Sequence, residues 1–265
     1  MEHDPAAFLL DTFRHVAGPK PKLLILNQPI ADFATFKKLW QHTDYRLCAD
    51  GGANRLYDML SGEPGNDKKS YVRILSLSSY LKTNFRKLPN IIHGDLDSLR
   101  NDVRMYYSAN GVTISRDPDQ YSTDFKKAMN HLTSLSTDPQ QDVIVLCTLG
   151  GRVDQGLGLL HEMYREHKSN PNVRLWLFSE CSVSFLLRKG QNRIYARTSS
   201  GCFTENVGIV PLYGAATVTT TGLEWDITDW ETKLGEQVST SNHVVQDVVT
   251  IYTSAEVLFT IEIAR

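Results

Sequence analysis

The stretch Arg46–Leu60, which reads RLCADGGANRLYDML, contains the structural unit that predicts the fold of the first part of the chain. A short apolar run, Arg46–Ala49, leads into Asp50-Gly51-Gly52, and a helical pattern follows from about Ala53 to Leu60. Apolar strands without polar alternation are typical of sheets that are buried on both faces. The order of strand, turn and helix therefore indicates a parallel sheet that is covered by helices on both sides.

The same order recurs along the first part of the chain. Five further apolar runs are expected to be strands: Leu23–Leu26, Ile91–Ile92, Val112–Ile114, Val143–Leu146 and Val173–Phe178. Helical patterns around 33–40, 102–109 and 125–135 lie between them. We therefore expect an α/β domain with a Rossmann-like parallel sheet over residues 1–188. It is interrupted at 61–88 by an insertion that opens on turn-forming residues.

The pattern changes after about Lys189. Runs of β-branched and aromatic residues follow one another, separated by Gly, Asn and Ser: Ile194–Ala196, Val207–Val210, Ala216–Thr221, Val244–Tyr252 and Val257–Ile263. No long helical pattern lies between these runs. This favours an antiparallel β-sandwich as a second domain, residues 189–265.

Composition excludes several functional classes. Among 265 residues, Lys+Arg 28 and Asp+Glu 30 give a net charge of -2, so no basic excess indicates a nucleic-acid partner. No apolar run approaches the roughly 20 residues that cross a bilayer. The acidic start, Met1–Pro5, lacks the basic region of a signal peptide. We therefore expect a cytoplasmic protein that binds neither membrane nor nucleic acid.

Acidic residues and glycines directly follow four of the expected strands. They stand in the segments Asp50–Arg55, Gly94–Ser98, Asp117–Asp124 and Thr148–Gln155. In open parallel sheets ligands bind outside the carboxyl ends of the strands, so we expect these segments to meet at one edge.

The residue types in these segments indicate a site for a metal ion and a polyphosphate. Clustered carboxylates need a positive partner, and oxygen ligands with few imidazoles or thiols suit Mg²⁺. Glycine pairs before a helix let backbone N–H groups approach an anion. Arg152 can contact phosphate oxygens through two parallel hydrogen bonds.

Each part also has an ordinary structural interpretation. Asp50 before two glycines is typical of a turn and a helix start, and Asp95–Asp97 of a capping loop. Arg152 with Asp154 could form a surface ion pair, and Asp124 favours a helix start. Only the shared position at one sheet edge favours a functional site, because the ordinary interpretations do not predict it.

Common nucleotide and zinc motifs do not match this chain. No G-x-x-x-x-G-K-[ST] sequence exists, which excludes a P-loop kinase. The run from Gly156 has His161 where a dinucleotide fingerprint has its last glycine. The spacing of His161 and His167 differs from that of the zinc motif H-E-x-x-H.

Several short motifs follow one another along nearly the whole chain. In the first domain they are Leu24–Pro29, Ala49–Asp58, Gly94–Ser98, Pro118–Gln120, Thr123–Phe125 and Leu149–Gln155. In the second domain they are Thr219–Trp225 (TTTGLEW) and Val238–Asn242 (VSTSN). In this order they resemble the motifs of thiamin pyrophosphokinase. The long segment 61–88 resembles fungal members. Tyr121 departs from the family pattern, which usually has an acid after the glutamine, so no metal role is assigned there.

The resemblance implies a thiamine diphosphokinase, which transfers the diphosphate of ATP to the hydroxyl of thiamin with Mg²⁺ and releases AMP. It implies a homodimer with thiamin between the acidic cleft of one subunit and the β domain of the other. The catalytic residues it implies are Asp50, Asp95, Asp97, Gln120, Asp124 and Arg152, with Asp95, Asp97 and Asp124 as metal ligands.

The resemblance also implies contacts to both substrates. The residues expected around the nucleotide are Gly51, Gly52, Asn54, Arg55, Ser98, Thr123, Gly150, Gly151, Asp154 and Gln155. Those expected around thiamin are Trp225, Ser239, Ser241 and Asn242. The face of Trp225 suits a flat cation such as thiamin. Without the resemblance, Trp225 is more typical of core packing.

Two other functions fit part of the pattern. A non-catalytic thiamin or nucleotide sensor on the same fold would not need acids at four strand ends. A Mg²⁺-dependent phosphohydrolase would leave Trp225 and the segment Ser239–Asn242 without a role.

Overall fold

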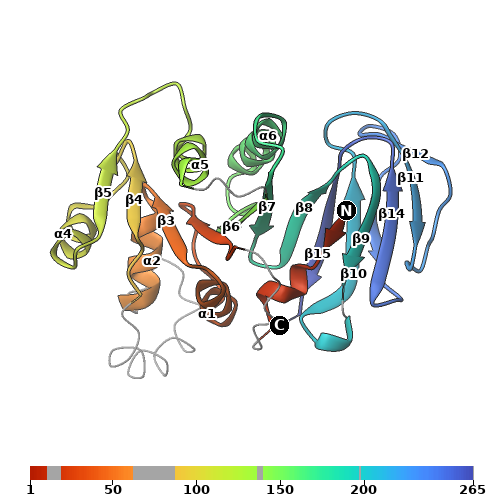
Figure 1. Ribbon diagram of the computed structural model, residues 1–265, viewed down its shortest axis with the longest axis horizontal. Coiled ribbons are helices and arrows are strands. Elements are labelled where there is room, and N and C mark those ends of the chain that lie inside the picture. The colour runs from red at the N-terminus through yellow and green to blue at the C-terminus, as the bar shows by residue number, and fades with distance from the viewer. Residues whose placement is uncertain (11–18, 62–86, 136–139, 197, 265) are drawn as a thin grey trace. The chain divides into compact units, whose positions relative to one another are not determined.

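The structure, a computed structural model, describes residues 1–10, 19–61, 87–135, 140–196 and 198–264. The chain divides into two compact units, which are described separately. We call Pro19–Val173 the α/β unit, and Met1–Gly18 with Arg174–Arg265 the β unit. Figure 1 shows the elements of both. All but the ends of the insertion expected at 61–88 lies outside the described residues.

The α/β unit contains a parallel sheet in the strand order β6-β2-β3-β4-β5. The strands are β2 (Lys22–Ile25), β3 (Tyr45–Ala49), β4 (Ile91–Gly94), β5 (Thr113–Arg116) and β6 (Gln141–Leu146). Leu24 of β2 lies opposite Leu47 on one side and Val145 on the other, and all three are fully buried. The parallel sheet expected from the unbroken apolar runs is confirmed.

Helices cover both faces of this sheet. They are α1 (Phe33–His42), α2 (Gly52–Ser61), α4 (Asn101–Ala109), α5 (Asp124–Ser134) and α6 (Val153–Ser169). Figure 1 shows α1 and α2 on one side of the sheet and α5 and α6 on the other. Asp32 caps α1 and Thr123 caps α5, because each side chain accepts a hydrogen bond from a backbone N–H of the first turn.

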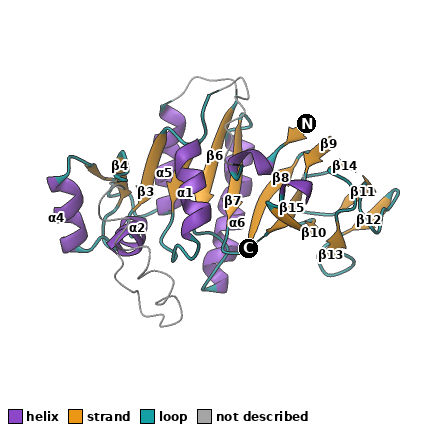
Figure 2. Cartoon of the chain, turned by 90° about the horizontal axis from the view of Figure 1, so that it is seen from below, coloured by secondary structure: helices purple, strands orange, loops and turns teal. Residues whose placement is uncertain are grey.

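The β unit consists of two sheets. One has the order β1-β9-β14-β11-β12, and in the other β13, β10, β15, β8 and β7 follow one another. The strands are β1 (Glu2–His3), β7 (Val173–Phe178), β8 (Ser182–Leu187), β9 (Gly190–Tyr195), β10 (Phe203–Val210), β11 (Ala216–Thr221), β12 (Trp230–Thr232), β13 (Ser239–His243), β14 (Val248–Thr253) and β15 (Val257–Ile263). The strands of each sheet pair antiparallel, except that β1 runs parallel to β9. Figure 2 shows this succession of strands and turns, and the expected antiparallel sandwich is confirmed.

An aromatic cluster forms part of the core of the β unit. The ring of Phe185 lies 4.7 Å from that of Trp176 and 5.3 Å from that of Phe259. Strand β8 pairs along its whole length with β15, and β7 pairs with β8, so residues 174–188 pack within the β unit. The sequence patterns place residues 174–188 in the expected α/β domain, residues 1–188. That residues 1–188 bind ATP and the metal ion, and residues 189–265 bind thiamin, stays a prediction.

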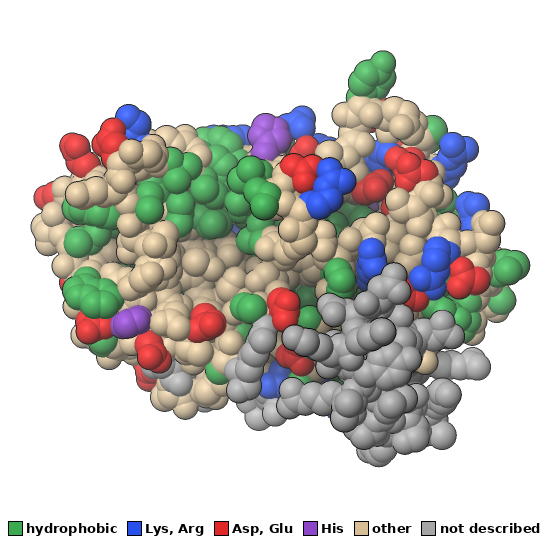
Figure 3. Space-filling model, turned by 180° about the vertical axis from the view of Figure 1, so that it is seen from behind, with side chains coloured by type: hydrophobic (Ala, Val, Ile, Leu, Met, Phe, Trp, Pro, Cys, Tyr) green, Lys and Arg blue, Asp and Glu red, His purple; other side chains and the backbone are tan. Residues whose placement is uncertain are grey.

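Charges of both signs are interspersed on the face shown in Figure 3, in keeping with the near balance of acidic and basic residues. Among the described helices, none combines the length and the apolar composition that a membrane-spanning helix requires.

Candidate active site

Three aspartates from different parts of the α/β unit meet at the carboxyl edge of its sheet. Asp50 follows β3, Asp95 follows β4, and Asp124 opens α5. Each offers a carboxylate oxygen, and these oxygens lie within 4.8 Å of one another. We call Asp50, Asp95 and Asp124 the aspartate triad. Asp97 is not part of it: its side chain is exposed and accepts a hydrogen bond of 3.0 Å from the hydroxyl of Ser98.

Backbone strain is concentrated in the connections that follow β3, β4 and β6, at the carboxyl edge of the sheet. Asp50 has φ 41° after β3, Leu96 has φ 65° after β4, and Cys147 and Leu149 have φ 67° and φ 50° after β6. Such conformations cost of order 1–3 kcal/mol each for residues other than glycine. The remaining structure must hold these residues in place, which is typical of functional sites.

Gly94 leaves the space in which two members of the triad approach each other. Its φ is 153°, and a Cβ atom built there would lie 2.8 Å from Oδ1 of Asp124 and 3.0 Å from Cβ of Asp50. Any side chain at this position would therefore separate the two carboxylates.

Two oxygens of the triad are buried without a hydrogen bond. Asp50 is only 1% exposed, and its Oδ2 accepts a 3.0 Å bond from the backbone N–H of Ser98. Its Oδ1 and Oδ1 of Asp124 accept none from the described residues. Buried carboxylate oxygens without partners are costly, and such oxygens are the ligands that Mg²⁺ prefers. The residues present therefore fit a divalent cation.

The environment shifts the pKa values of the three carboxyls in different directions. Burial is the main cause that raises the pKa of Asp50, and the charge of Asp95 adds to it. Burial, followed by the charges of Asp95 and Asp50, raises the pKa of Asp124 to about 6. Burial also acts to raise the pKa of Asp95. The hydrogen bond from the N–H of Asp97 and the ammonium of Lys127 outweigh that effect, so this pKa is lowered.

Lys127 is a member of the site that the sequence did not reveal. Its side chain is 1% exposed, and its Nζ lies 3.3 Å from Oδ2 of Asp95 and 3.9 Å from Oδ1 of Asp124. Lys127 stands three positions after Asp124 on α5, so both side chains lie on one face of the helix. That spacing is the only signal in the sequence, and it does not by itself predict burial.

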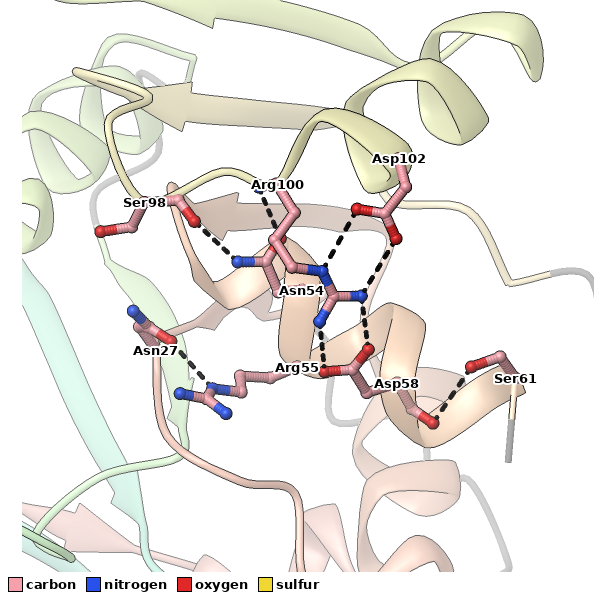
Figure 4. Close-up of polar contacts among 8 residues, drawn as sticks. All are labelled: Asn27, Asn54, Arg55, Asp58, Ser61, Ser98, Arg100 and Asp102. Atoms are coloured by element: carbon pink, nitrogen blue, oxygen red, sulfur yellow. Dashed lines mark hydrogen bonds and ion pairs between the residues drawn. The ribbon is translucent and has the colours of Figure 1, made fainter. Parts of the chain in front are cut away.

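Asn54, which is expected near the nucleotide, holds the loop that carries Asp95. Its side-chain amide donates a 2.8 Å bond to the carbonyl of Ser98 and accepts a 3.1 Å bond from the N–H of Arg100 (Figure 4). Arg100 is in turn paired with Asp58 of α2 by two bonds of 2.9 and 2.7 Å. The loop between β4 and α4 is thus bound to α2 at several points.

Close packing requires glycine at positions 51 and 52, whether or not a ligand binds there. A Cβ on Gly51 would lie 2.3 Å from the side-chain nitrogen of Asn27, and one on Gly52 would lie 2.3 Å from the carbonyl oxygen of Ile25. Asn27 also accepts a 2.8 Å bond from Arg55. The start of α2 therefore packs tightly against the end of β2.

A second glycine pair lies between β6 and α6. Gly151 has φ 71°, and a Cβ there would lie 2.8 Å from Oε1 of Gln28. Gly150 is exposed and has only the carbonyl of Thr148 nearby, at 3.8 Å from such a Cβ. The end of β2 thus approaches both expected phosphate-binding turns.

The remaining expected residues of this unit are exposed. Arg152 bonds to Asp154 at 3.0 and 2.6 Å, and its hydrogen bonds with Asp154 raise the pKa of Arg152. Gln120 and Gln155 have exposed side chains, and Thr123 serves as the cap of α5. In the structure Arg152 thus forms an ion pair with Asp154 on the surface at the start of α6, as in the ordinary interpretation of these two residues.

In the β unit, Trp225 is held by Asn242. The buried Asn242 side chain accepts from the N–H of Trp225 at 3.2 Å and donates to its carbonyl at 2.9 Å. Trp225 itself is 54% exposed, with its ring 5.2 Å from that of His243. Ser241 is exposed and Ser239 half-buried on the same strand.

Asp226 is a further residue that the sequence did not single out. It accepts three bonds, from Thr220 Oγ1 at 2.9 Å, Leu223 N at 3.1 Å and Gly222 N at 2.9 Å. This fixes the loop that presents Trp225. Beside this loop, a shallow pocket is lined by Phe203, Glu205, Glu224, His243, Val244 and Val245.

A strained acidic site at the carboxyl edge of a parallel sheet, together with a β-sandwich unit, defines a two-domain α/β protein with a ligand site at that edge. Residues 36–175 match the family described as "Thiamin pyrophosphokinase, catalytic domain", and residues 191–258 match "Thiamin pyrophosphokinase, vitamin B1 binding domain". The chain belongs to the thiamin pyrophosphokinase family.

Individual relatives agree with this membership. Thiamine pyrophosphokinase 1 of Arabidopsis thaliana is 32% identical over 98% of this chain and 92% of its own length. Thiamine pyrophosphokinase of Saccharomyces cerevisiae is 30% identical over 91% of this chain and 85% of its own. The structure of thiamin pyrophosphokinase from Candida albicans superposes with a TM-score of 0.78 and 27% identity, covering 99% of this chain and 92% of that one.

Proposed function

We propose that this chain transfers the diphosphate group of ATP to the hydroxyl of thiamin, giving thiamin diphosphate and AMP. The observation that carries the proposal is the aspartate triad, in which two buried oxygens accept no hydrogen bond from the described residues, inside the segment that matches the catalytic domain of the family. Transfer of this kind depends on positioning and on neutralisation of phosphate charge, which an acidic metal site can provide.

We propose Mg²⁺ as the cation and the triad as its ligands. The resemblance implied Asp97 as a metal ligand and Asp50 as a further catalytic residue, whereas the geometry favours Asp50 as the ligand. Bound Mg²⁺ would supply positive charge to the phosphate oxygens. The protein itself fixes the positions of the three carboxylates through Gly94, Asn54 and the strained turns.

Several groups at the same edge suit the phosphates of ATP. The N-termini of α2 and α6 present backbone N–H groups and the positive end of the helix dipole. Arg152 is exposed, so its guanidinium can exchange Asp154 for phosphate oxygens at low cost. Gln120 is exposed and can turn to orient a phosphate or the thiamin hydroxyl.

For thiamin we propose the exposed face of Trp225, positioned by Asn242, with Ser239 and Ser241 on the adjacent strand β13. A tryptophan face stabilises a cationic ring by about 0.5–2 kcal/mol. The homodimer in which Trp225 serves the partner's acidic site, and the cytoplasmic location, remain predictions from the resemblance and the sequence.

Incubation of the full chain with ATP, Mg²⁺ and thiamin tests the proposal. Equal amounts of AMP and thiamin diphosphate are expected. Binding of thiamin without AMP formation would indicate the sensor. Release of ADP or phosphate without consumption of thiamin would indicate the phosphohydrolase.

A further inference from the structure

A buried lysine lies next to the carboxylates that are proposed to hold Mg²⁺. Nζ of Lys127 lies 3.3 Å from Oδ2 of Asp95 and 3.9 Å from Oδ1 of Asp124, and the side chain is 1% exposed. Charged side chains are almost never buried to this extent unless they are paired. Lys127 is therefore held at this position by the triad, and the triad by Lys127.

The charges of this group show what Lys127 contributes. Three ionised carboxylates and one ammonium carry a net charge of two negative units, which one divalent cation neutralises. Without the ammonium, three carboxylates whose oxygens lie within 4.8 Å of one another would repel each other until metal arrived.

The adjacent lysine on α5 provides an internal comparison. Nζ of Lys126 lies 2.9 Å from Oε2 of Glu166, whose side chain is 1% exposed. Lys126 thus also neutralises a buried carboxylate, but on α6 and outside the triad. The two lysines differ in the acids they face.

We infer that Lys127 is a positioning residue: its ammonium group holds the triad together in the absence of metal and weakens the binding of Mg²⁺ by the triad. The inference rests on the metal site of the proposed function. It concerns the metal-free protein and needs neither ATP nor thiamin.

Thermal unfolding of the full chain, in EDTA and across a Mg²⁺ titration without nucleotide or thiamin, tests this role. Lys127→Met should lower the Tm in EDTA. It should also bind Mg²⁺ on the order of tenfold more tightly than the unaltered chain, seen as a larger rise in Tm. Lys127→Arg, which keeps the charge, should respond to Mg²⁺ as the unaltered chain does. Lys126→Met should lower the Tm equally with and without Mg²⁺.

A Mg²⁺ response of Lys127→Met no larger than that of Lys126→Met would overturn the inference. If Lys127→Met does not fold, the double variant Asp95→Asn/Lys127→Met decides, because it removes one charge of each sign. Recovery of a folded protein in EDTA supports the inference, and failure to recover overturns it. A chain that shows the expected Mg²⁺ pattern but forms no AMP with thiamin would reject only the proposed function.

Discussion

Gly94 and Asp124 lie so close together that a Cβ atom on Gly94 would be 2.8 Å from Oδ1 of Asp124. The two residues come from different elements, the end of β4 and the start of α5. Real Cβ atoms are essentially never found this close to another heavy atom. The absence of a side chain at residue 94 is therefore a condition for the triad.

Gly94→Ala should reduce turnover by on the order of 100-fold or more, because displacement of a catalytic group by about 1 Å has effects of this size. Gly111→Ala is the matched control, since Gly111 also has a positive φ of 79° but has no atom within 4 Å of such a Cβ. Steady-state kinetics and melting curves of both variants provide the measurement. Equal losses of activity in the two variants would contradict a steric role for Gly94.

The raised pKa of Asp124, about 6, predicts how the stability of the metal-free protein depends on pH. In the unfolded chain this carboxyl has its ordinary pKa near 4, so between about pH 4 and pH 6 the native state binds more protons. The contribution of Asp124 to the free energy of unfolding should therefore be present at low pH and be lost as pH rises through this window.

An asparagine side chain cannot ionise, so Asp124→Asn should remove this contribution to the pH dependence of the free energy of unfolding. In EDTA above pH 6 the variant should be more stable than the unaltered chain, and it should be inactive. Urea unfolding at several pH values with and without the substitution measures the difference. A variant that is less stable than the unaltered chain at pH 7 in EDTA would show that burial does not disfavour the charged form.

Asn54→Ala should destabilise the protein by about 1–3 kcal/mol, because it leaves the carbonyl of Ser98 and the N–H of Arg100 without their partner. Activity should fall further than stability explains, since the loop carrying Asp95 loses its attachment to α2. Asn110→Ala serves as the control. It also removes a side-chain amide, which donates a hydrogen bond to the carbonyl of Tyr106 at the end of α4. An active Asn54→Ala enzyme at low temperature would limit Asn54 to a folding role.

Arg152→Lys should lower turnover while leaving the Tm nearly unchanged. Lysine keeps the charge but loses the planar fork that bonds to two phosphate oxygens. The side chains of Arg152 and Asp154 are 75% and 61% exposed, so the ion pair itself should contribute little to stability. The opposite result, a changed Tm with unchanged kinetic constants, would identify a purely structural pair.

Trp225→Ala should raise the KM for thiamin strongly and leave the KM for ATP nearly unchanged. Asn242→Ala should have the same selectivity, because both backbone polar groups of Trp225 bond to Asn242. Mixed dimers test the subunit arrangement. A dimer of one Trp225→Ala chain and one Asp95→Asn chain should regain about half the activity if each site uses both subunits. Mixed dimers without recovery would assign Trp225 to its own chain's site or to none.

The sequence predicted the elements whose signals are local. The apolar run before Asp50 and the helix after Gly52 became β3 and α2 within one or two residues, because turn residues mark the boundary. The convergence of Asp50, Asp95 and Asp124 followed from a general property of parallel sheets.

What the sequence did not show depends on backbone conformation and on distant contacts. The left-handed turn at Leu96 separates Asp95, which points into the triad, from Asp97, which does not, and no residue type there predicts it. The sequence around Lys127 is typical of a surface lysine. Its burial follows only from the packing of α5 against the sheet. Strand β8 lacked a turn signal strong enough to separate it from β7, so its place beside β15 was missed.

The pairing of β1 with β9 limits how early the β unit can be completed during synthesis. Glu2 and His3 are synthesised 191 residues before Arg193 and Ile194, their partners in β9. By then all strands of the α/β unit have been synthesised, and domains generally fold as units during synthesis. The β unit is discontinuous in sequence, so its first strand can pair in the native way only after β9 has been made.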